Sequence, residues 1–247
     1  MAKRAATKKR APRKTGRGAK RQAATRVGFR GLVLRVLIGL AGLLLIWIAA
    51  YAVIRPPTTP YILKEGLRLG GVERSWVDMD DIAPVVARSV VAAEDADFCL
   101  HWGFDMGALR DAIAQGATRG GSTISQQTVK NVWLWQGRSW PRKAIEAVMT
   151  PLVELMWTKR RVLEVYLNVA EFDEGVFGVE AAALHYFGVP ASGLSNWQAA
   201  LLASVLPDPK GRNAAAPGEA MAARARAIAD GAATIRADGR ARCFEDR

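Results

Sequence analysis

An uninterrupted apolar run near the N-terminus constrains this chain more than any other feature. Residues Val36 to Ile54 contain no charged side chain, and Arg35 and Arg55 bracket them. At about 1.5 Å of rise per residue, a helix of this length nearly spans the roughly 30 Å hydrocarbon layer of a bilayer. The run therefore predicts a transmembrane helix over 36–54, which holds the rest of the chain at a membrane surface.

The charges before this run predict its orientation. Twelve of the 35 Lys and Arg residues lie within residues 1–30, which contain no Asp or Glu, so the other 23 balance the 23 acidic residues. Such a tail cannot bury enough apolar surface to fold, and basic flanks stay in the cytoplasm. We expect a disordered, cytoplasmic tail over 1–35 and an outward-facing domain. The membrane accounts for the tail without a nucleic-acid partner, which we do not expect.

A cleavable signal peptide is the alternative for the same segment. Ala50-Tyr51-Ala52 has the small-x-small form of a cleavage site. An uncleaved anchor is favoured because the apolar run exceeds a usual signal-peptide core and the basic leader is long. Sequencing the N-terminus of the native protein distinguishes the two, since cleavage would leave a chain that begins near Val53.

The remaining chain shows helical patterns. Asp80 to Ala93 predicts a helix with Pro84 in its first turn, and the apolar stripe from Ile145 to Met156 predicts another, kinked at Pro151. No sustained alternation of period two is present, so the expected fold class is mainly α. We expect a proline-rich linker over 55–60, a helical domain over 61–209 and a C-terminal helical extension over 210–247.

The chain has two cysteines, Cys99 and Cys243. Two cysteines cannot build a disulfide framework or a cysteine-based metal site. A single bond between them is an open alternative in an oxidising compartment. We expect free thiols, because one pair makes no pattern.

Four motifs follow one another in the domain. Residues 94–105 read Glu-Asp-Ala-Asp-Phe-Cys-Leu-His-Trp-Gly-Phe-Asp, and residues 120–131 read Gly-Gly-Ser-Thr-Ile-Ser-Gln-Gln-Thr-Val-Lys-Asn; the third and fourth motifs are 142–146 and 159–168. In this order they resemble the peptidoglycan glycosyltransferases, glycosyltransferase family 51, over about 61–209. The departures are Thr128, Asp173 and Gln198, none of which falls on a catalytic position of the family.

The resemblance implies a lysozyme-like helical domain that polymerises lipid II on a growing lipid-linked glycan strand. It implies β-1,4-linked product, inversion at the anomeric carbon and release of undecaprenyl pyrophosphate. It also implies a bacterial inner-membrane protein with a periplasmic domain, other cell-wall synthesis and division proteins as partners, and a monofunctional enzyme, since no transpeptidase domain fits after the last motif. The alternatives are a lytic hydrolase of the same polymer and an inactive scaffold.

The chemistry requires one base and a group of cations. A proton must leave the acceptor hydroxyl, while pyrophosphate departs as an anion and needs positive charge around it. We expect Glu94 to be the base, and the resemblance makes Glu146 a second essential carboxylate. Lys130, Arg138, Arg142 and Lys143 are the expected cations, since Arg and Lys bind phosphate oxygens.

The Gly-rich second motif supplies the other expected substrate contacts, which are Ser122, Thr123, Gln126, Gln127 and Asn131. Ser122 and Thr123 could alternatively cap a helix. We leave His101 out of the catalytic set, and expect Glu164, Tyr166 and Asn168 to stabilise the fold. No cofactor is required, although a divalent cation, Mg²⁺ or Mn²⁺, could assist departure of pyrophosphate; no ligand cluster is visible for it.

Overall fold

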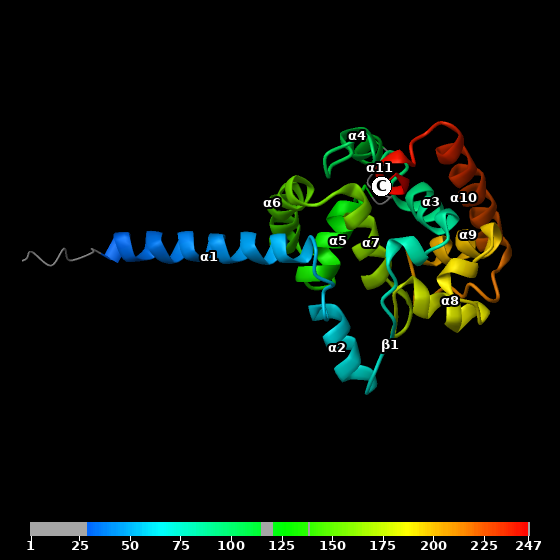
Figure 1. Ribbon diagram of the computed structural model, residues 1–247, viewed down its shortest axis with the longest axis horizontal. Coiled ribbons are helices and arrows are strands. Elements are labelled where there is room, and N and C mark those ends of the chain that lie inside the picture. Colours follow the sequence, from blue (N-terminus) through cyan, green and yellow to red (C-terminus); the bar gives the residue numbers. More distant parts are fainter. Residues whose placement is uncertain (1–28, 115–120, 138, 247) are drawn as a thin grey trace, which may run out of the picture. The chain divides into compact units, whose positions relative to one another are not determined.

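The computed structural model describes residues 29–114, 121–137 and 139–246 (Figure 1). The predicted basic tail therefore lies mostly outside the described residues. Within them the chain is mainly helical, which confirms the predicted fold class. The helices are α1 (Phe29–Tyr51), α2 (Pro60–Leu69), α3 (Pro84–Glu94), α4 (Met106–Ala114), α5 (Ile124–Trp133), α6 (Trp140–Met156), α7 (Lys159–Val169), α8 (Val179–Phe187), α9 (Asn196–Val205), α10 (Glu219–Ala237) and α11 (Arg242–Glu245).

Helix α1 covers the apolar run as far as Tyr51, three residues before the predicted end at Ile54. It begins at Phe29, before the charge-free residues, and among the described helices it alone is long and apolar enough to cross a membrane, over Arg30–Tyr51. Most of its leucines and isoleucines are exposed, with Ile46 at 67%, while Ile48 near its end is buried. This exposure fits a membrane anchor, since a bilayer supplies the apolar surroundings that the chain does not. Of the described residues, those up to Ala41 form one compact unit and those from Gly42 onwards form a second.

The last turns of α1 are hydrogen-bonded to the body of the domain. The indole nitrogen of Trp157 donates to the Ile48 carbonyl at 2.8 Å. Arg161 donates to the carbonyls of Tyr51 and Ile54 at 3.1 and 2.7 Å. Because the last carbonyls of a helix have no partner within it, these contacts fix the end of α1 on the domain.

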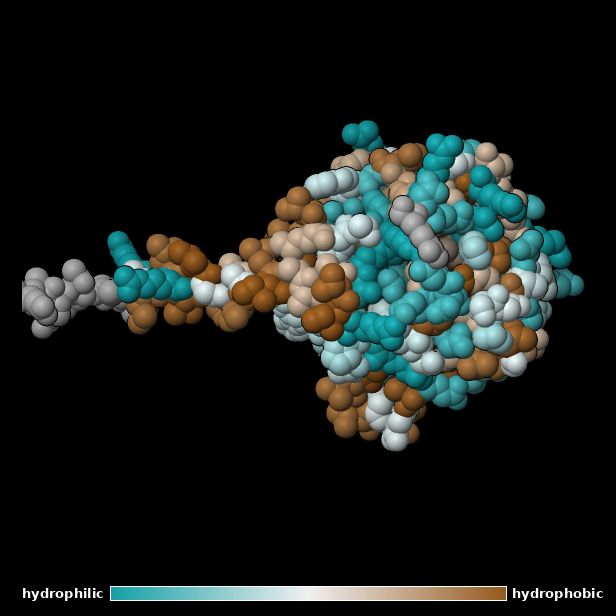
Figure 2. All heavy atoms as spheres, in the orientation of Figure 1, coloured by the Kyte–Doolittle hydropathy of each residue, from teal (hydrophilic) through white to brown (hydrophobic). Residues whose placement is uncertain are grey.

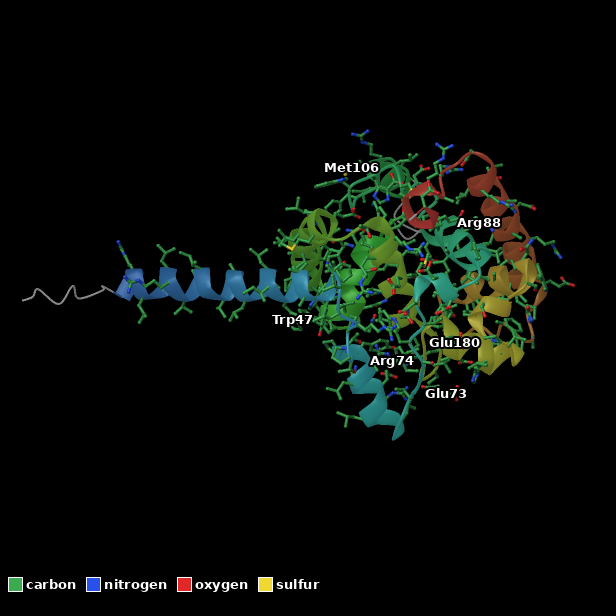
Figure 3. All side chains as sticks on the ribbon, viewed as in Figure 1. Trp47, Glu73, Arg74, Arg88, Met106 and Glu180 are labelled. Carbon is green, nitrogen blue, oxygen red and sulfur yellow. A yellow bond between two sulfur atoms is a disulfide. The ribbon has the colours of Figure 1, made fainter. Side chains whose placement is uncertain are left out.

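The linker after α1 is held in the same way. Arg74 of β1 donates to the carbonyls of Pro57 and Pro56 at 2.6 and 2.8 Å (Figure 3). The carbonyl oxygens of these two prolines lie outside any helix, and the guanidinium of Arg74 binds both. The segment between α1 and α2 is therefore tied to the domain.

The body has two groups of helices and one small sheet. Helix α5 packs on α6 and α7, while α3, α9 and α10 pack on one another (Figure 1). Strands β1 (Glu73–Arg74), β3 (Val176–Phe177) and β2 (Glu171–Asp173) lie in that order, with β1–β3 parallel and β2–β3 antiparallel. Strands of two or three residues are too short to show an alternating pattern, which is why the sequence did not predict them.

One further helix boundary differs from its prediction. The helix expected from Asp80 begins at Pro84, and a short 3₁₀ turn, Met79–Asp81, precedes it. Proline suits the first helical position because its missing N–H would have no helical partner there. Helix α6 continues through Pro151 as far as Met156.

The expectation of free thiols was wrong. Cys99 and Cys243 form a disulfide with their Cα atoms 5.7 Å apart, across 144 residues of sequence. Helix α11 packs on α7 and brings Cys243 to the turn that follows α3. Proximity created by tertiary packing leaves no trace in the spacing of two cysteines.

Candidate active site

The first motif is clamped to the start of α5. Glu94 is the last residue of α3, and Asp95 follows it. Asp95 accepts hydrogen bonds from the Ile124 amide at 2.9 Å and from His101 Nε2 at 2.7 Å. The N-terminal amides of a helix are free to bind a carboxylate. Asp95 and His101 therefore fix the loop that carries Glu94, as expected for a structural histidine.

Thr123 and Gln126 form a capping box at the same helix end. The Thr123 hydroxyl accepts from the Gln126 amide at 3.3 Å, and Gln126 Oε1 accepts from the Thr123 amide at 3.1 Å. The Thr123 hydroxyl also donates to the Gly103 carbonyl at 2.7 Å. Gly103 has φ +80°, and a Cβ there would lie 2.6 Å from Thr150. Both motif side chains are buried in this capping role, the alternative stated for Thr123, and their contact with substrate stays a prediction.

The carboxylate of Glu94 is held from two sides. Gln127 Nε2 donates to Glu94 Oε2 at 2.9 Å, and an Arg224 nitrogen lies 4.0 Å from Oε1. The Tyr166 hydroxyl donates to Gln127 Oε1 at 3.1 Å. The Glu94 side chain is 13% exposed, so it is partly shielded yet still reachable. A line of hydrogen bonds thus runs from the buried Tyr166 to the predicted base.

Glu146 holds two of the predicted cations. It is 2% exposed and forms ion pairs with Arg142 and with Lys143, the latter at 3.1 Å. The Lys143 ammonium also donates to Ser122 Oγ at 3.1 Å. Residues three and four apart share one face of a helix, so the first turns of α6 present all three charges together.

Lys130 adds a third positive charge beside this group. Burial lowers the pKa of Lys130 below its ordinary value, and the nearby Arg142 lowers it further, while Glu94 opposes the shift. The pKa of Lys143 is lowered by burial and then by Arg142 and Lys130. Mutual repulsion of this kind requires the three cations to lie close together. Their charge exceeds that of Glu146, so the site favours an anion.

Two recesses open at the Glu94–Gln127 pair. One, of about 520 Å³, is lined by Glu94 and Ser122 among others. The other, of about 330 Å³, is lined by Gln127, Lys130 and Tyr166 among others. The Glu94 side chain therefore borders the first recess, and the Lys130 side chain borders the second.

The predicted site residues have different outcomes. The structure brings seven of them together, namely Glu94, Ser122, Gln127, Lys130, Arg142, Lys143 and Glu146. Asn131 lines the second recess and accepts from Gln136 at 3.2 Å. Arg138 lies outside the described residues. The sequence reasoning assigned Tyr166 only to the fold, and it missed Arg224, which comes from α10 and carries no signal in the motifs.

A divalent cation finds no obvious protein ligands. Among residues 29–114, 121–137 and 139–246, no three His, Cys, Asp or Glu side chains are grouped to hold a metal ion. The two carboxylates of the site do not fit the role, since Glu146 is already paired with two cations. We derive no step that involves a metal, and an unchanged rate in strong chelator would exclude one.

Comparison with known proteins places the chain in a family. The model of the Transglycosylase family matches residues 64–233, a range that extends into α10. A biosynthetic peptidoglycan transglycosylase of Jannaschia sp. (strain CCS1) is 67% identical over 215 residues, covering 87% of this chain and 90% of the relative. One from Caulobacter vibrioides (strain ATCC 19089 / CIP 103742 / CB 15) is 43% identical over 218 residues, covering 87% and 95%.

A third relative, from Yersinia pestis (strain Pestoides F), has the same name and is 49% identical over 186 residues, 69% of this chain and 77% of the relative. The family match over residues 64–233 covers the four motifs. The chain belongs to the transglycosylase family and is a glycosyltransferase of peptidoglycan biosynthesis.

Proposed function

We propose that this enzyme polymerises lipid II on a growing lipid-linked glycan strand, with Glu94 as the base. The supporting observation is the Glu94 carboxylate, which Gln127 holds near Lys130 and its neighbouring cations, two of which pair with Glu146. Glu94 takes the proton of the acceptor hydroxyl as its oxygen attacks the anomeric carbon of the donor. The bond to pyrophosphate breaks on the opposite face, so the α-linked donor becomes a β-1,4-linked product.

The cations stabilise the negative charge of the leaving group. Undecaprenyl pyrophosphate leaves as an anion, and Lys130, Arg142 and Lys143 would neutralise its charge. Because burial and mutual repulsion lower the pKa values of both lysines, an incoming anion relieves an unfavourable interaction. Arg138, which precedes α6, remains a proposed member of this group.

The carboxylates do not suit a glycosidase. Hydrolysis requires a carboxylic acid that protonates an alkoxide leaving group. Glu146 is instead buried and bound to two cations, Arg142 and Lys143. Its proposed role is to position Arg142 and Lys143, and this role fits transfer from pyrophosphate rather than cleavage of glycan.

The proposed location is the bacterial inner membrane. Helix α1 would cross the membrane with its basic N-terminus in the cytoplasm and the catalytic domain in the periplasm. The disulfide between Cys99 and Cys243 supports this orientation, because such bonds persist in oxidising compartments. Other cell-wall synthesis and division proteins are proposed partners.

Polymerisation of purified lipid II tests the proposal. Glu94→Gln should lower the initial rate by about 10²- to 10⁴-fold, the usual contribution of a positioned base. The matched control is Glu73→Gln, which makes the same change in an exposed glutamate on β1. A folded Glu94→Gln enzyme with the wild-type rate would refute the assignment of the base. Cleavage of preformed glycan without polymer formation would instead indicate a hydrolase.

A further inference from the structure

Helix α2 exposes its leucines, while Ile62 on its inner face is buried. Leu63 and Leu67, the outer leucine pair, are 56% and 79% exposed. The glutamate of the same helix, Glu65, is 3% exposed. A surface helix of a soluble domain has the opposite arrangement, with leucine inside and glutamate outside. Residues four apart share a helix face, so the leucines form one apolar surface.

The inner face explains why the helix cannot rotate. Glu65 accepts hydrogen bonds from Arg68 Nε at 2.9 Å and from Lys210 at 2.8 Å. Hydrogen bonds from these two cations lower the pKa of Glu65 to about 2. A buried carboxylate paired in this way is costly to withdraw from its partners. The orientation of the outer leucine pair is therefore fixed by charge pairs on the opposite side.

The position of α2 in the chain identifies what could cover the leucines. Helix α2 begins at Pro60, shortly after the end of α1 at Tyr51, and the residues between include the exposed Val53 and Ile54, at 80% and 57%. Hydrophobic side chains cover the outside of α2 (Figure 2). Since Arg161 holds the carbonyls of Tyr51 and Ile54, the end of the anchor and α2 belong to one body.

We propose that α2 lies in the membrane interface, with the outer leucine pair inserted among the acyl chains next to the anchor. Lys64 lies on the exposed side of the helix, where a long basic side chain reaches lipid phosphates. The catalytic domain thus contacts the bilayer through a second element as well as α1. This inference rests on the proposed anchor, and it fixes the height of the active site above the surface from which lipid substrates come.

A single-label experiment tests the contact. Because Cys99 and Cys243 are bonded to each other, an introduced cysteine is the one free thiol of the chain. Leu67→Cys carries an environment-sensitive fluorophore in the full chain, reconstituted in nanodiscs of phosphatidylethanolamine and phosphatidylglycerol. The matched control is Leu184→Cys on α8, where the leucine is 48% exposed.

The label at position 67 should be quenched by lipids that carry nitroxide on their acyl chains and protected from aqueous iodide. The label at position 184 should show the reverse. Equal iodide quenching of the two labels in disc-bound protein would overturn the inference. The same result is expected if another protein, and not lipid, covers α2 in cells. Protein that fails to remain with the discs would instead overturn the anchor, so the two failures are distinguishable.

Discussion

The Glu94 carboxylate and the Tyr166 hydroxyl bind opposite ends of the Gln127 amide. An ionised carboxylate only accepts hydrogen bonds, so the NH₂ group of Gln127 must face Glu94 and its oxygen must face Tyr166. Burial, together with the charges of Glu94 and Asp95, raises the pKa of Tyr166 well above its ordinary value. Tyr166 therefore keeps its proton beyond the pH at which an ordinary tyrosine loses it, and it acts as a positioning residue.

Tyr166→Phe should lower kcat and leave KM nearly unchanged. One hydrogen bond contributes about 0.5–1.5 kcal/mol, which corresponds to a loss of roughly 2- to 10-fold. Steady-state kinetics of polymerisation measures this split. Tyr186→Phe is the control, because that buried hydroxyl bonds Phe172 and Asp173 away from the site. Equal losses of kcat in the two variants would show that Tyr166 acts only through stability.

The lowered pKa values of Lys130 and Lys143 predict the alkaline limb of the pH profile. Each lysine loses its proton at a lower pH than a free lysine, so the cationic site of the free enzyme weakens as pH rises through that lowered value. Bound pyrophosphate favours the ammonium form and moves the pKa back upward. The alkaline fall in kcat/KM, which reports free enzyme, should therefore precede the fall in kcat.

Lys130→Arg provides the check on this prediction. An arginine stays charged across the range, so the alkaline fall in kcat/KM should move to higher pH even where the absolute rate is lower. Polymerisation rates of wild type and Lys130→Arg, measured from pH 7 to 10.5, test this prediction. An alkaline limb at the same pH in both enzymes would mean that other groups produce it.

At this scale the sequence predicted which residues lie together better than what each one does. Motif order was enough to group Glu94 with the cations, since each motif contributes one side of the site. The capping role of Gln126 and the link from Tyr166 to Gln127 depend on rotamers and on contacts between helices. Arg224 comes from a helix about 130 residues away, and no local pattern records such a contact.

Among the elements, α2 gives a prediction about acid. Hydrogen bonds from Arg68 and Lys210 lower the pKa of Glu65 from 4.5 to about 2. A carboxyl group with a lowered folded-state pKa contributes stability above its unfolded pKa, and that contribution is lost as pH falls through the folded value. The free energy of unfolding should therefore drop between about pH 4.5 and 2.

Glu65→Gln should lower stability at neutral pH and flatten the dependence on acid in that range. Urea titrations of detergent-solubilised wild type and variant at several pH values measure both effects. Glu73→Gln is a suitable control, because Glu73 is 63% exposed and pairs only with a histidine. Parallel acid dependence in wild type and Glu65→Gln would contradict the assignment.

Element prediction succeeded where the hydrophobic pattern is long. Residues 145–156 and 162–167 repeat at helical spacing, and both segments lie in helices α6 and α7. It failed at the start of α3, where proline set the boundary, and at the strands, which are too short to alternate. The sequence also did not predict that Glu65 of α2 is buried while the leucines are exposed, because the lysine that binds Glu65 lies 145 residues away.

At the scale of the whole molecule, the C-terminal part supports the catalytic centre. Helix α10 packs on α3 and supplies Arg224 near Glu94. Beyond it, Arg240 donates to the Ala96 carbonyl at 3.1 Å and pairs with Asp97 at 3.0 Å. Residues distant in sequence therefore hold the start of the loop that follows Glu94, a role that the sequence did not predict for residues 210–247.

The disulfide between Cys99 and Cys243 closes a segment of 144 residues and ties α11 to this loop. Replacing both cysteines by alanine should lower the free energy of unfolding by about 2–4 kcal/mol, because the unfolded chain regains the freedom that the bond removes. The initial rate should change little, since Arg160 donates to the Phe244 carbonyl at 2.8 Å and Phe244 packs on Phe98. Urea titration measures the stability, and lipid II polymerisation measures the rate.

Reductant should destabilise wild type to the level of the double variant and leave that variant unaffected. Wild type that keeps its full stability in reductant, with the thiols shown to be free, would mean that packing of α11 alone maintains the loop.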